Sequence, residues 1–386
     1  MRIVDVCGFY TPHGGGVRTY IEQKIRITPQ LGHDLTVVIP GPEAKVIERG
    51  PGARMVMIPS PRFFLDRKYY YFEHADSIWK ALDDARPDVV EVSSPWRSPS
   101  MVARWDGNVP LSLVMHADPM SAYAYRWLSP LLRRERIERL FYQFQDHMRE
   151  MGQVYDRVVC ASHEFADRLT HAGVDNVVTI PMGVEPNLFS PQLRDEELRT
   201  ELLRHCNLPP EARLLLGVGR LSNEKRWPMV IDAVQLASQS APLGLVIFGK
   251  GKVRAKVQAH IAGNPHVRLF EPETDRHKFA RIVASCDALI HGCDAETFCM
   301  AAAEARASGI PVIVPDLGGA ADHGRDGSGL HYRAASATSA ADAILTLLKT
   351  PELQRPEARS MSIDDHFRAL YAEYATIQAR PRRSAA

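Results

Sequence analysis

The chain has 386 residues, of which 24% are charged and 45% hydrophobic, and its formal net charge at pH 7 is +1. This composition is typical of a soluble globular protein with room for two domains, and it gives no global signal for nucleic-acid binding. No apolar run approaches the ~20 residues of a membrane span and we expect no leader, which predicts a cytoplasmic protein. The six cysteines are scattered without C-x-x-C spacing, so we expect reduced thiols and no structural zinc.

The first predicted element is a buried parallel strand over residues 2–7, which is short and rich in β-branched residues. Gly14, Gly15 and Gly16 follow it, and a helical pattern then runs over residues 17–31. A strand, a glycine loop and a helix start form a backbone nest that can hold an anion. The same residues can equally make a tight turn, so the pattern alone leaves both interpretations open.

Strands and helices alternate through the rest of the first half, which predicts βαβ units and a Rossmann-like domain. The expected strands cover residues 34–40, 54–58, 88–92, 111–115, 156–162 and 177–184, and the expected helices cover residues 72–85 and 164–170. His116 directly follows one of these strands, at the sheet edge where ligands bind. A histidine with a purely structural hydrogen bond would fit the same position.

A long helical region is expected over residues 120–153. It carries aromatic residues followed by arginines, which are Tyr123, Tyr125, Trp127, Arg133, Arg134 and Arg136. Aromatic rings beside arginines can rest on an anionic membrane surface. The alternative is a helix that packs on the core and turns a basic face to solvent.

The second half repeats the alternation and brings two cations to a strand end. Arg220 and Lys225 follow the strand at residues 214–219. Two cations suit an anionic ligand, since an arginine can bind two of its oxygens, although a solvated loop could contain the same residues. Further expectations are strands at residues 245–248 and 267–270, solvated Lys252, Arg268 and Arg276, an amphipathic helix at residues 364–377, and a disordered tail at residues 380–386.

The most informative stretch joins a strand at residues 288–290 to another at residues 311–314. Between them lies an Ala-rich helix that begins near Phe298 and is stopped by a glycine. In a parallel sheet such a helix start lies at the ligand-binding edge, and its exposed amides attract phosphate. Glu296 can then contact the group attached to the phosphate, and Glu304, about two turns along, a ribose. An Ala-rich helix with two solvated glutamates would show the same spacing.

Several of these motifs together resemble the retaining glycosyltransferases of family 4, which have the GT-B fold. The runs that carry the resemblance are Glu296-Thr297-Phe298 with Glu304-Ala305, Gly219-Arg220-Leu221 with Glu224-Lys225, His116 with Asp118, the glycine loop at residues 14–16, and Met182-Gly183-Val184-Glu185. The resemblance implies an α/β fold of two Rossmann-like, doubly wound domains facing a cleft. Residues 1–183 would bind the acceptor, residues 184–362 the nucleotide sugar, and the helix at residues 363–379 would cross back to the N-terminal domain.

The resemblance also implies a role for each candidate site residue. The donor diphosphate would be held by Gly14, Gly15, Gly16, Arg220, Lys225, Thr297, Phe298, Cys299 and Met300, and the ribose by Glu304. The residues with a catalytic role would be His116 and Glu296, which contact the sugar, together with Arg220 and Lys225, which stabilise the leaving group. Two departures from the family pattern are Cys299, in place of a usual glycine, and the loop Gly318-Gly319-Ala320-Ala321-Asp322. No Asp-x-Asp follows a strand, so we expect no metal, and no cofactor besides the donor.

Within the family, Glu91 in its strand, Val158-Val159-Cys160 and Phe9-Tyr10 resemble bacterial mannosyltransferases that use GDP-mannose on phosphatidylinositol mannosides or related glycolipids. The expected function is retaining transfer of a hexose, with mannose as the preferred sugar, to a hydroxyl of a glycolipid or saccharide acceptor. We also expect peripheral contact at the inner membrane face and no nucleic-acid partner. The alternatives are a UDP-hexose donor with a soluble acceptor, and a GT-B enzyme that processes nucleotide sugars without an acceptor. A module that only binds nucleotide sugars would be expected to lack His116, Lys225 or Glu296, and all three are present.

Overall fold

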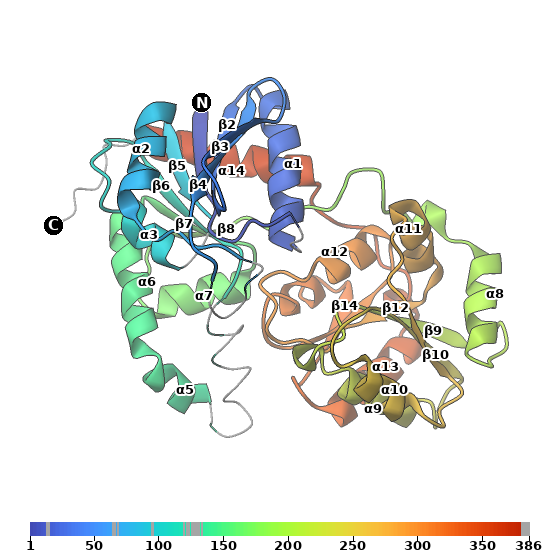
Figure 1. Ribbon diagram of the computed structural model, residues 1–386. Helices are drawn as coiled ribbons and strands as arrows, with labels where there is room; N and C mark the ends of the chain where they lie inside the picture. The colour runs from blue at the N-terminus through green and yellow to red at the C-terminus, as the bar shows by residue number, and fades with distance from the viewer. Residues whose placement is uncertain are drawn as a thin grey trace. The chain divides into compact units, whose positions relative to one another are not determined.

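The computed structural model describes residues 1–12, 16–63, 67, 69–93, 96–118, 120, 124, 132 and 134–379. Gly14, Gly15, the aromatic residues Tyr123, Tyr125 and Trp127, Arg133, and the tail 380–386 lie outside the described residues. The chain divides into two compact units, of which unit 1 comprises Met1–Pro181 with Ile363–Ala386 and unit 2 comprises Met182–Ser362. Figure 1 labels their elements.

Unit 1 contains an eight-stranded sheet in the order β3-β4-β2-β1-β5-β6-β7-β8. Its strands are β1 (Arg2–Val6), β2 (Asp34–Gly41), β3 (Lys45–Glu48), β4 (Ala53–Pro59), β5 (Val89–Val92), β6 (Leu111–Met115), β7 (Arg157–Cys160) and β8 (Val177–Thr179). All neighbouring strands pair in parallel except β3 and β4. The carboxyl ends of β1, β5 and β6 therefore lie at the same edge, and β6 leads directly to His116.

The helices of unit 1 are α1 (Gly16–Gln30), α2 (Ala75–Ala85), α3 (Arg97–Val102), α5 (Arg134–Leu140), α6 (Tyr142–Val154), α7 (His163–His171) and α14 (Ile363–Gln378). Within the helical region predicted over residues 120–153, the described residues form two helices, α5 and α6, which are separated at Phe141. The predicted strand at residues 177–184 is too long. It stops at Thr179, two residues before Pro181, which has no N–H for a sheet hydrogen bond.

Unit 2 contains a six-stranded, all-parallel sheet in the order β11-β10-β9-β12-β13-β14. Its strands are β9 (Arg213–Val218), β10 (Leu243–Phe248), β11 (Val267–Phe270), β12 (Ala288–Ile290), β13 (Val312–Pro315) and β14 (Gly329–Tyr332). Its α-helices are α8 (Glu196–His205), α9 (Trp227–Ala237), α10 (Arg254–Ile261), α11 (Arg276–Ser285), α12 (Met300–Ala307) and α13 (Ala337–Lys349), and the short 3-10 helices η2 (Pro191–Leu193), η3 (Asn223–Lys225), η4 (Ala321–Gly324) and η5 (Pro351–Leu353) join them.

The core of each unit is built from the apolar runs that form its strands and from the helix faces that cover them. In unit 2, Trp227 of α9, Ile247 of β10 and Ile313 of β13 belong to one cluster of buried residues. Burial of aliphatic and aromatic side chains contributes about 1.5–3 kcal/mol each, so such a cluster fixes the strand ends that carry the candidate site. Among the residues described, no helix is both long and apolar enough to cross a bilayer.

The last helix, α14, returns to unit 1 and packs against α1, as the red and blue helices of Figure 1 show. Its buried face includes Phe367, Leu370, Tyr371 and Tyr374, which is the amphipathic face that the sequence predicts. The C-terminal helix therefore completes the hydrophobic covering of the first unit.

Candidate functional site

The centre of the candidate site in unit 2 is an ion pair between Lys225 and Glu296. Lys225 ends η3, in the loop after β9, and Glu296 lies in the loop after β12. The Lys225 ammonium donates a hydrogen bond to a Glu296 carboxylate oxygen, and their side chains are 13% and 25% exposed. Because β9 and β12 are neighbours in the sheet, two strand ends bring together residues that are far apart in the sequence.

The pair is held in its charged form by mutual attraction. Burial by itself raises the pKa of Glu296, but the Lys225 cation and His291 outweigh it, so the pKa lies well below its ordinary value. Burial likewise lowers the pKa of Lys225, and the Glu296 carboxylate outweighs that effect and raises it. Glu296 is therefore a carboxylate at neutral pH, and it accepts hydrogen bonds only.

His291 holds Glu296 from another side. Its Nε2 lies 3.4 Å from the Glu296 Oε1 atom, and its backbone oxygen accepts a 2.7 Å hydrogen bond from the Tyr332 hydroxyl. Burial lowers the pKa of His291, so the ring is neutral at pH 7. This role was not predicted, and its only signal in the sequence is the position of His291 directly after the strand β12.

Cys299, Phe298 and Met300 form the start of α12. Cys299 is buried and has φ 76° and ψ 74°, in the left-handed region that favours glycine. In the part of the chain that the structure describes, the backbone N–H groups of these three residues donate no hydrogen bond. They have the character of helix-start amides that bind an anion. The predicted contact with a diphosphate stays a prediction.

The glycine pair Gly318-Gly319 supports the loop that carries Glu296. A Cβ atom at Gly319 would lie 2.4 Å from the backbone carbon of Thr297, and one at Gly318 would lie 2.4 Å from the Asp294 oxygen. The Gly319 N–H donates a 2.6 Å hydrogen bond to the Glu296 carbonyl. The loop that departs from the family pattern therefore packs directly beneath the site loop, where only glycines fit.

Two further contacts fix the site loop and were not predicted from the sequence. Arg226 donates to both carboxylate oxygens of Asp294, at 2.6 and 3.0 Å. His323 Nε2 donates a 2.7 Å hydrogen bond to the Phe298 carbonyl, since a carbonyl can only accept. The only sequence signal for Arg226 was its place beside Lys225.

Glu304 is buried in α12 and pairs with Arg276 of α11. The Arg276 Nη2 donates a 2.8 Å hydrogen bond to Glu304 Oε1, and its guanidinium lies 5.1 Å from the ring centre of Phe189 and 5.6 Å from that of Phe279. The side chain of Arg276 is 48% exposed, so it is in contact with solvent as predicted, and it also pairs with a carboxylate that is only 7% exposed and requires a cation. Burial raises the pKa of Glu304, and Arg276 offsets this in part.

The alternative of two solvated glutamates is wrong for this stretch, since Glu296 and Glu304 each have a buried or half-buried cationic partner. The structure does not bring Arg220 to this cluster. Its side chain is 79% exposed and lies 3.4 Å from Glu224, while its backbone oxygen accepts from the Trp227 indole. Arg220 is thus an exposed cation on the loop whose other end holds Lys225.

In unit 1, His116 follows β6 and rests on the ring of Tyr20 from α1. The two ring centres are 4.3 Å apart, with an angle of 59° between the planes. Burial lowers the pKa of His116 to about 4, so the imidazole is neutral at pH 7. Asp118, two residues on, accepts a hydrogen bond from Arg168 and one of 3.0 Å from the Met120 N–H. Gly16 begins α1, and its predicted phosphate contact stays a prediction.

Three groups in unit 2 have the chemistry of metal ligands. Ligand atoms of His291, Glu296 and Cys299 lie within 4.8 Å of one another. The Lys225 ammonium contacts the same carboxylate, so a cation there would have to displace it. The six cysteines are free thiols, and burial raises the pKa of the Cys299 thiol far above its ordinary range.

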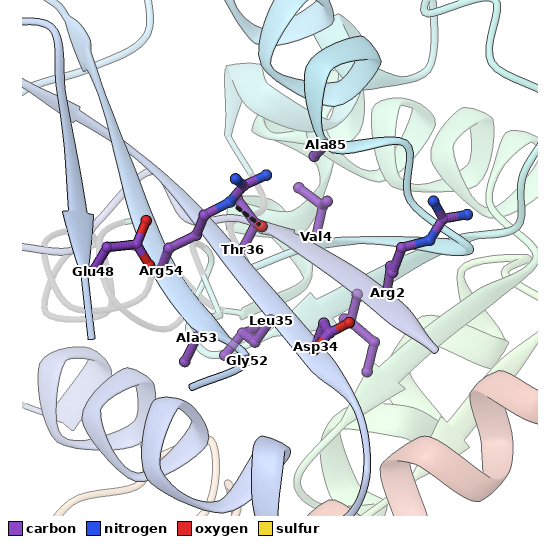
Figure 2. A pocket seen from close by; sticks show the side chains of 11 residues that line it. Arg2, Val4, Asp34, Leu35, Thr36, Glu48, Gly52, Ala53, Arg54 and Ala85 are labelled. Carbon is purple, nitrogen blue, oxygen red and sulfur yellow. Dashed lines mark hydrogen bonds between the residues drawn. The ribbon is translucent and has the colours of Figure 1, made fainter. Parts of the chain in front are cut away.

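A hollow in unit 1, shown in Figure 2, lies away from these residues. It is lined at the amino ends of β1, β2 and β4, where Arg54 Nε donates a 3.1 Å hydrogen bond to Thr36. His116 follows a carboxyl end of the same sheet, and the strands β1, β2, β5 and β6 are parallel. The hollow is therefore at the opposite edge and has no share in the candidate site.

Comparisons with known proteins agree on one class of enzyme. Residues 14–188 match the model described as Glycosyltransferase Family 4, and residues 199–360 match the model described as Glycosyl transferases group 1. A GDP-mannose-dependent alpha-(1-6)-phosphatidylinositol dimannoside mannosyltransferase of Mycobacterium tuberculosis is 29% identical over 315 residues, which cover 81% of this chain and 79% of the relative. A GDP-mannose-dependent alpha-mannosyltransferase of the same species is 26% identical, covering 83% of this chain and 81% of the relative.

Solved structures of similar fold include a glycosyltransferase from Rickettsia africae, with a TM-score of 0.68 and 17% identity over 98% of each chain. A sucrose-phosphate synthase from Thermosynechococcus elongatus has a TM-score of 0.67 and 16% identity, over 98% of this chain and 96% of that chain. At this identity the likeness shows the fold alone. It confirms the predicted GT-B class, with two Rossmann-like units.

Proposed function

We propose, from the premise that the chain belongs to the family 4 glycosyltransferases, that it transfers mannose from GDP-mannose to a hydroxyl of a glycolipid, with retention of configuration. The observation that carries the proposal is the Lys225–Glu296 ion pair, in which Glu296 lies just before the start of α12. Two relatives of the chain are named GDP-mannose-dependent mannosyltransferases. The structural likenesses contribute the fold and say nothing about the donor.

Stabilisation of the leaving diphosphate is assigned to unit 2. Negative charge develops on the diphosphate as the anomeric bond breaks, and preorganised donors stabilise it without reorganising. Lys225 supplies a cation, and the N–H groups of Phe298, Cys299 and Met300 supply dipoles at the helix start. The Arg220 side chain is 79% exposed, so it can change its rotamer. We assign its guanidinium to the diphosphate after the donor has bound.

Orientation of the sugar is assigned to Glu296. Its carboxylate is fixed by Lys225 and His291 and remains ionised, so it accepts hydrogen bonds from sugar hydroxyls and takes up no proton. His116 is a neutral imidazole that can donate or accept one hydrogen bond, and we assign it to a hydroxyl of the transferred sugar. Glu304 is assigned to the ribose. None of these side chains is assigned the role of a nucleophile.

Contact with a lipid surface is assigned to the junction of α5 and α6. Leu140, Phe141 and Tyr142 are 63%, 37% and 56% exposed in succession, and Arg136 and Arg139 of the same turn region are also exposed. Large apolar side chains beside arginines suit the interface of an anionic bilayer. Sedimentation with vesicles of phosphatidylcholine, with and without phosphatidylinositol, tests this: Leu140→Ser with Tyr142→Ser should release the protein, and unchanged binding would refute the assignment.

The transfer itself is tested with radiolabelled GDP-mannose and phosphatidylinositol mannoside in detergent. We expect a labelled glycolipid that α-mannosidase cleaves, no product with Lys225→Met, and no requirement for added metal after EDTA treatment. Product with UDP-glucose but not with GDP-mannose would overturn the choice of donor. Release of mannose or its phosphate at equal rates with and without acceptor would overturn the assignment as a glycolipid transferase.

A further inference from the structure

Three side chains with the chemistry of metal ligands lie on one loop of unit 2, between β12 and the start of α12. They are His291, Glu296 and Cys299, and their ligand atoms lie within 4.8 Å of one another. In the described part of the chain, no second set of three such side chains comes together in this way. Imidazole nitrogen, carboxylate oxygen and thiolate sulfur are the ligands that Zn²⁺ takes in proteins. The loop therefore offers the donor atoms of a three-ligand zinc site.

The imidazole of His291 has a nitrogen that the fold leaves without a hydrogen bond. His291 is 3% exposed, and among the described residues its buried Nε2 atom has no hydrogen-bond partner. This atom lies 3.4 Å from Glu296 Oε1, in a contact that lacks hydrogen-bond geometry. A buried polar atom without a hydrogen bond costs about 1–3 kcal/mol. A bond from this nitrogen to a metal ion removes that cost.

The spacing of the three ligands is close to that of a tetrahedral site. Bonds of roughly 2.0–2.3 Å to a tetrahedral zinc ion place neighbouring ligand atoms on the order of 3.5 Å apart. The 3.4 Å between His291 Nε2 and Glu296 Oε1 already has this value. The Cys299 sulfur lies within 4.8 Å of ligand atoms of both residues, so a displacement of about 1 Å brings it into the same coordination sphere.

The loop that carries the three ligands is fixed by its neighbours. The Glu296 carbonyl accepts a 2.6 Å hydrogen bond from the Gly319 N–H. Arg226 donates to both carboxylate oxygens of Asp294, at 2.6 and 3.0 Å, so Asp294 already has a cation of its own and is not a ligand. Three protein ligands on a fixed loop leave the fourth position of a tetrahedral ion to water or to another small ligand.

Lys225 competes with a metal ion for Glu296. Its ammonium donates a hydrogen bond to the Glu296 carboxylate, and a divalent cation bound to that carboxylate repels it. Cys299 is a protonated thiol, because burial raises its pKa far above the ordinary range, so formation of the metal–sulfur bond releases one proton to solvent. The thiolate and the carboxylate then neutralise the divalent ion, and Lys225 loses its partner. The bound metal and the ion pair therefore exclude each other.

We propose that His291, Glu296 and Cys299 form an inhibitory site for Zn²⁺, in which the bound ion takes Glu296 away from Lys225. The metal site is independent of the proposed function. The inhibition rests on that function, which assigns the leaving diphosphate to Lys225 and the sugar to Glu296. Mg²⁺ should not bind, because it requires oxygen ligands in octahedral geometry, and only one of the three ligands offers oxygen.

The first test uses Co²⁺, which enters zinc sites and gives a charge-transfer absorption in the near ultraviolet when it binds a thiolate. After EDTA treatment and dialysis, the full-length protein should bind one Co²⁺ with this absorption, and Zn²⁺ should displace it. Cys299→Ser keeps the shape of the side chain. It should abolish the absorption and weaken Zn²⁺ binding at least about 100-fold, since even an outer-shell change costs about 10–100-fold.

Cys293→Ala is the matched control, because Cys293 is a buried free thiol on the same loop and is not one of the three ligands. It should leave the Co²⁺ absorption and the Zn²⁺ affinity unchanged. An absorption that survives in Cys299→Ser or disappears in Cys293→Ala would overturn the ligand set. Absence of the absorption in the wild type at millimolar Co²⁺ would overturn the site.

Two further variants should change the Zn²⁺ affinity in opposite directions. Lys225→Met removes the competing cation and leaves a carboxylate without its partner, so Zn²⁺ should bind at least about tenfold more tightly. Added Zn²⁺ should also recover part of the melting temperature that this substitution loses. His291→Gln removes a ligand and should weaken binding. Equal Zn²⁺ affinities of Lys225→Met and the wild type would refute the competition between the metal and Lys225.

Transfer assays separate the metal site from the proposed function. Zn²⁺ should inhibit sugar transfer by the wild type, EDTA should restore it, and Mg²⁺ at the same concentration should have no effect. Cys299→Ser should have the same rate with and without Zn²⁺, whatever that rate is. Full activity of the wild type with one Zn²⁺ bound would overturn the inhibition. If the wild type transfers no sugar, the proposed function fails, while the Co²⁺ and Zn²⁺ titrations still decide the metal site.

Discussion

Replacing Lys225 by methionine is predicted to destabilise unit 2 and to abolish sugar transfer. Methionine keeps the length of the side chain and removes its charge, so Glu296 stays three-quarters buried without its cation. Breaking a buried ion pair by removing one partner costs ~3–5 kcal/mol. We take about 3 kcal/mol, because Glu296 keeps some exposure and its contact with His291. For a unit of this size that loss lowers the melting temperature by roughly 6–12 °C.

The assay is thermal unfolding of four proteins: the wild type, Lys225→Met, Glu296→Gln and the double variant. The double variant should be more stable than Lys225→Met, since it leaves no uncompensated charge, and the coupling free energy should be about 2 kcal/mol. Lys278→Met is the matched control. Lys278 pairs with Glu273 at 3.0 Å, but its side chain is 60% exposed, so we expect no measurable shift and full activity.

The pH dependence of stability is a further test of the Lys225–Glu296 pair. The pKa of Glu296 is lower in the folded protein than its ordinary value of 4.5. Its contribution to stability is therefore fully present above about pH 4.5 and is lost as the pH falls toward the folded pKa. Glu296→Gln should remove this part of the acid destabilisation. A Lys225→Met protein that melts with the wild type, or losses that simply add in the double variant, would refute the buried pair as the centre of the site.

Three further predictions follow from the same geometry. Burial raises the pKa of Glu304 despite Arg276, so Glu304→Gln should raise the melting temperature at pH 7 and weaken GDP binding in calorimetry. A lower melting temperature would contradict the expected direction of the stability change. Cys299 has φ 76°, so Cys299→Gly should be tolerated. Cys299→Val introduces a β-branched residue of similar size and should lower the free energy of unfolding by about 1–3 kcal/mol in chemical denaturation. Equal stability of the two variants would show that backbone conformation is not the constraint. Since the pKa of Glu296 is lowered and that of Lys225 raised, kcat/KM should be flat between roughly pH 5.5 and 9.5, and a limb near pH 7 would show that another group titrates during the reaction.

Most of the parallel strands could be predicted because they are short apolar runs, such as Arg2–Val6 and Leu214 to Val218, that are largely buried. The parallel strand Gly329–Tyr332 was not predicted, since it is short and only partly buried. The antiparallel strand Lys45–Glu48 could not be predicted, since it is an edge strand of mostly exposed residues and has no buried face to impose a pattern. The break at Phe141 could not be predicted either, because residues on both sides of it favour a helix and local propensity marks no interruption there.

The candidate site residues could be named from the sequence, but their partners could not. Lys225 and Glu296 are separated by 71 positions and Arg276 and Glu304 by 28, and nothing local shows that their side chains meet. The family resemblance assigned Lys225 to a diphosphate and Glu296 to a sugar as separate contacts. The order of β9 and β12 in the sheet is what makes them one charged unit.

Under the proposed function, the electrostatics of the two units favour catalysis by fixed charge over catalysis by proton transfer. Glu296 and Lys225 hold each other in their ionised forms, and burial keeps His116 neutral with a pKa of about 4. A general acid or base at neutral pH requires a pKa near 7, and none of these groups has one. A retaining transfer through an oxocarbenium-like transition state, by contrast, requires a stabilised leaving diphosphate and an oriented sugar. A fixed cation, a fixed carboxylate and a neutral imidazole are suited to those two tasks.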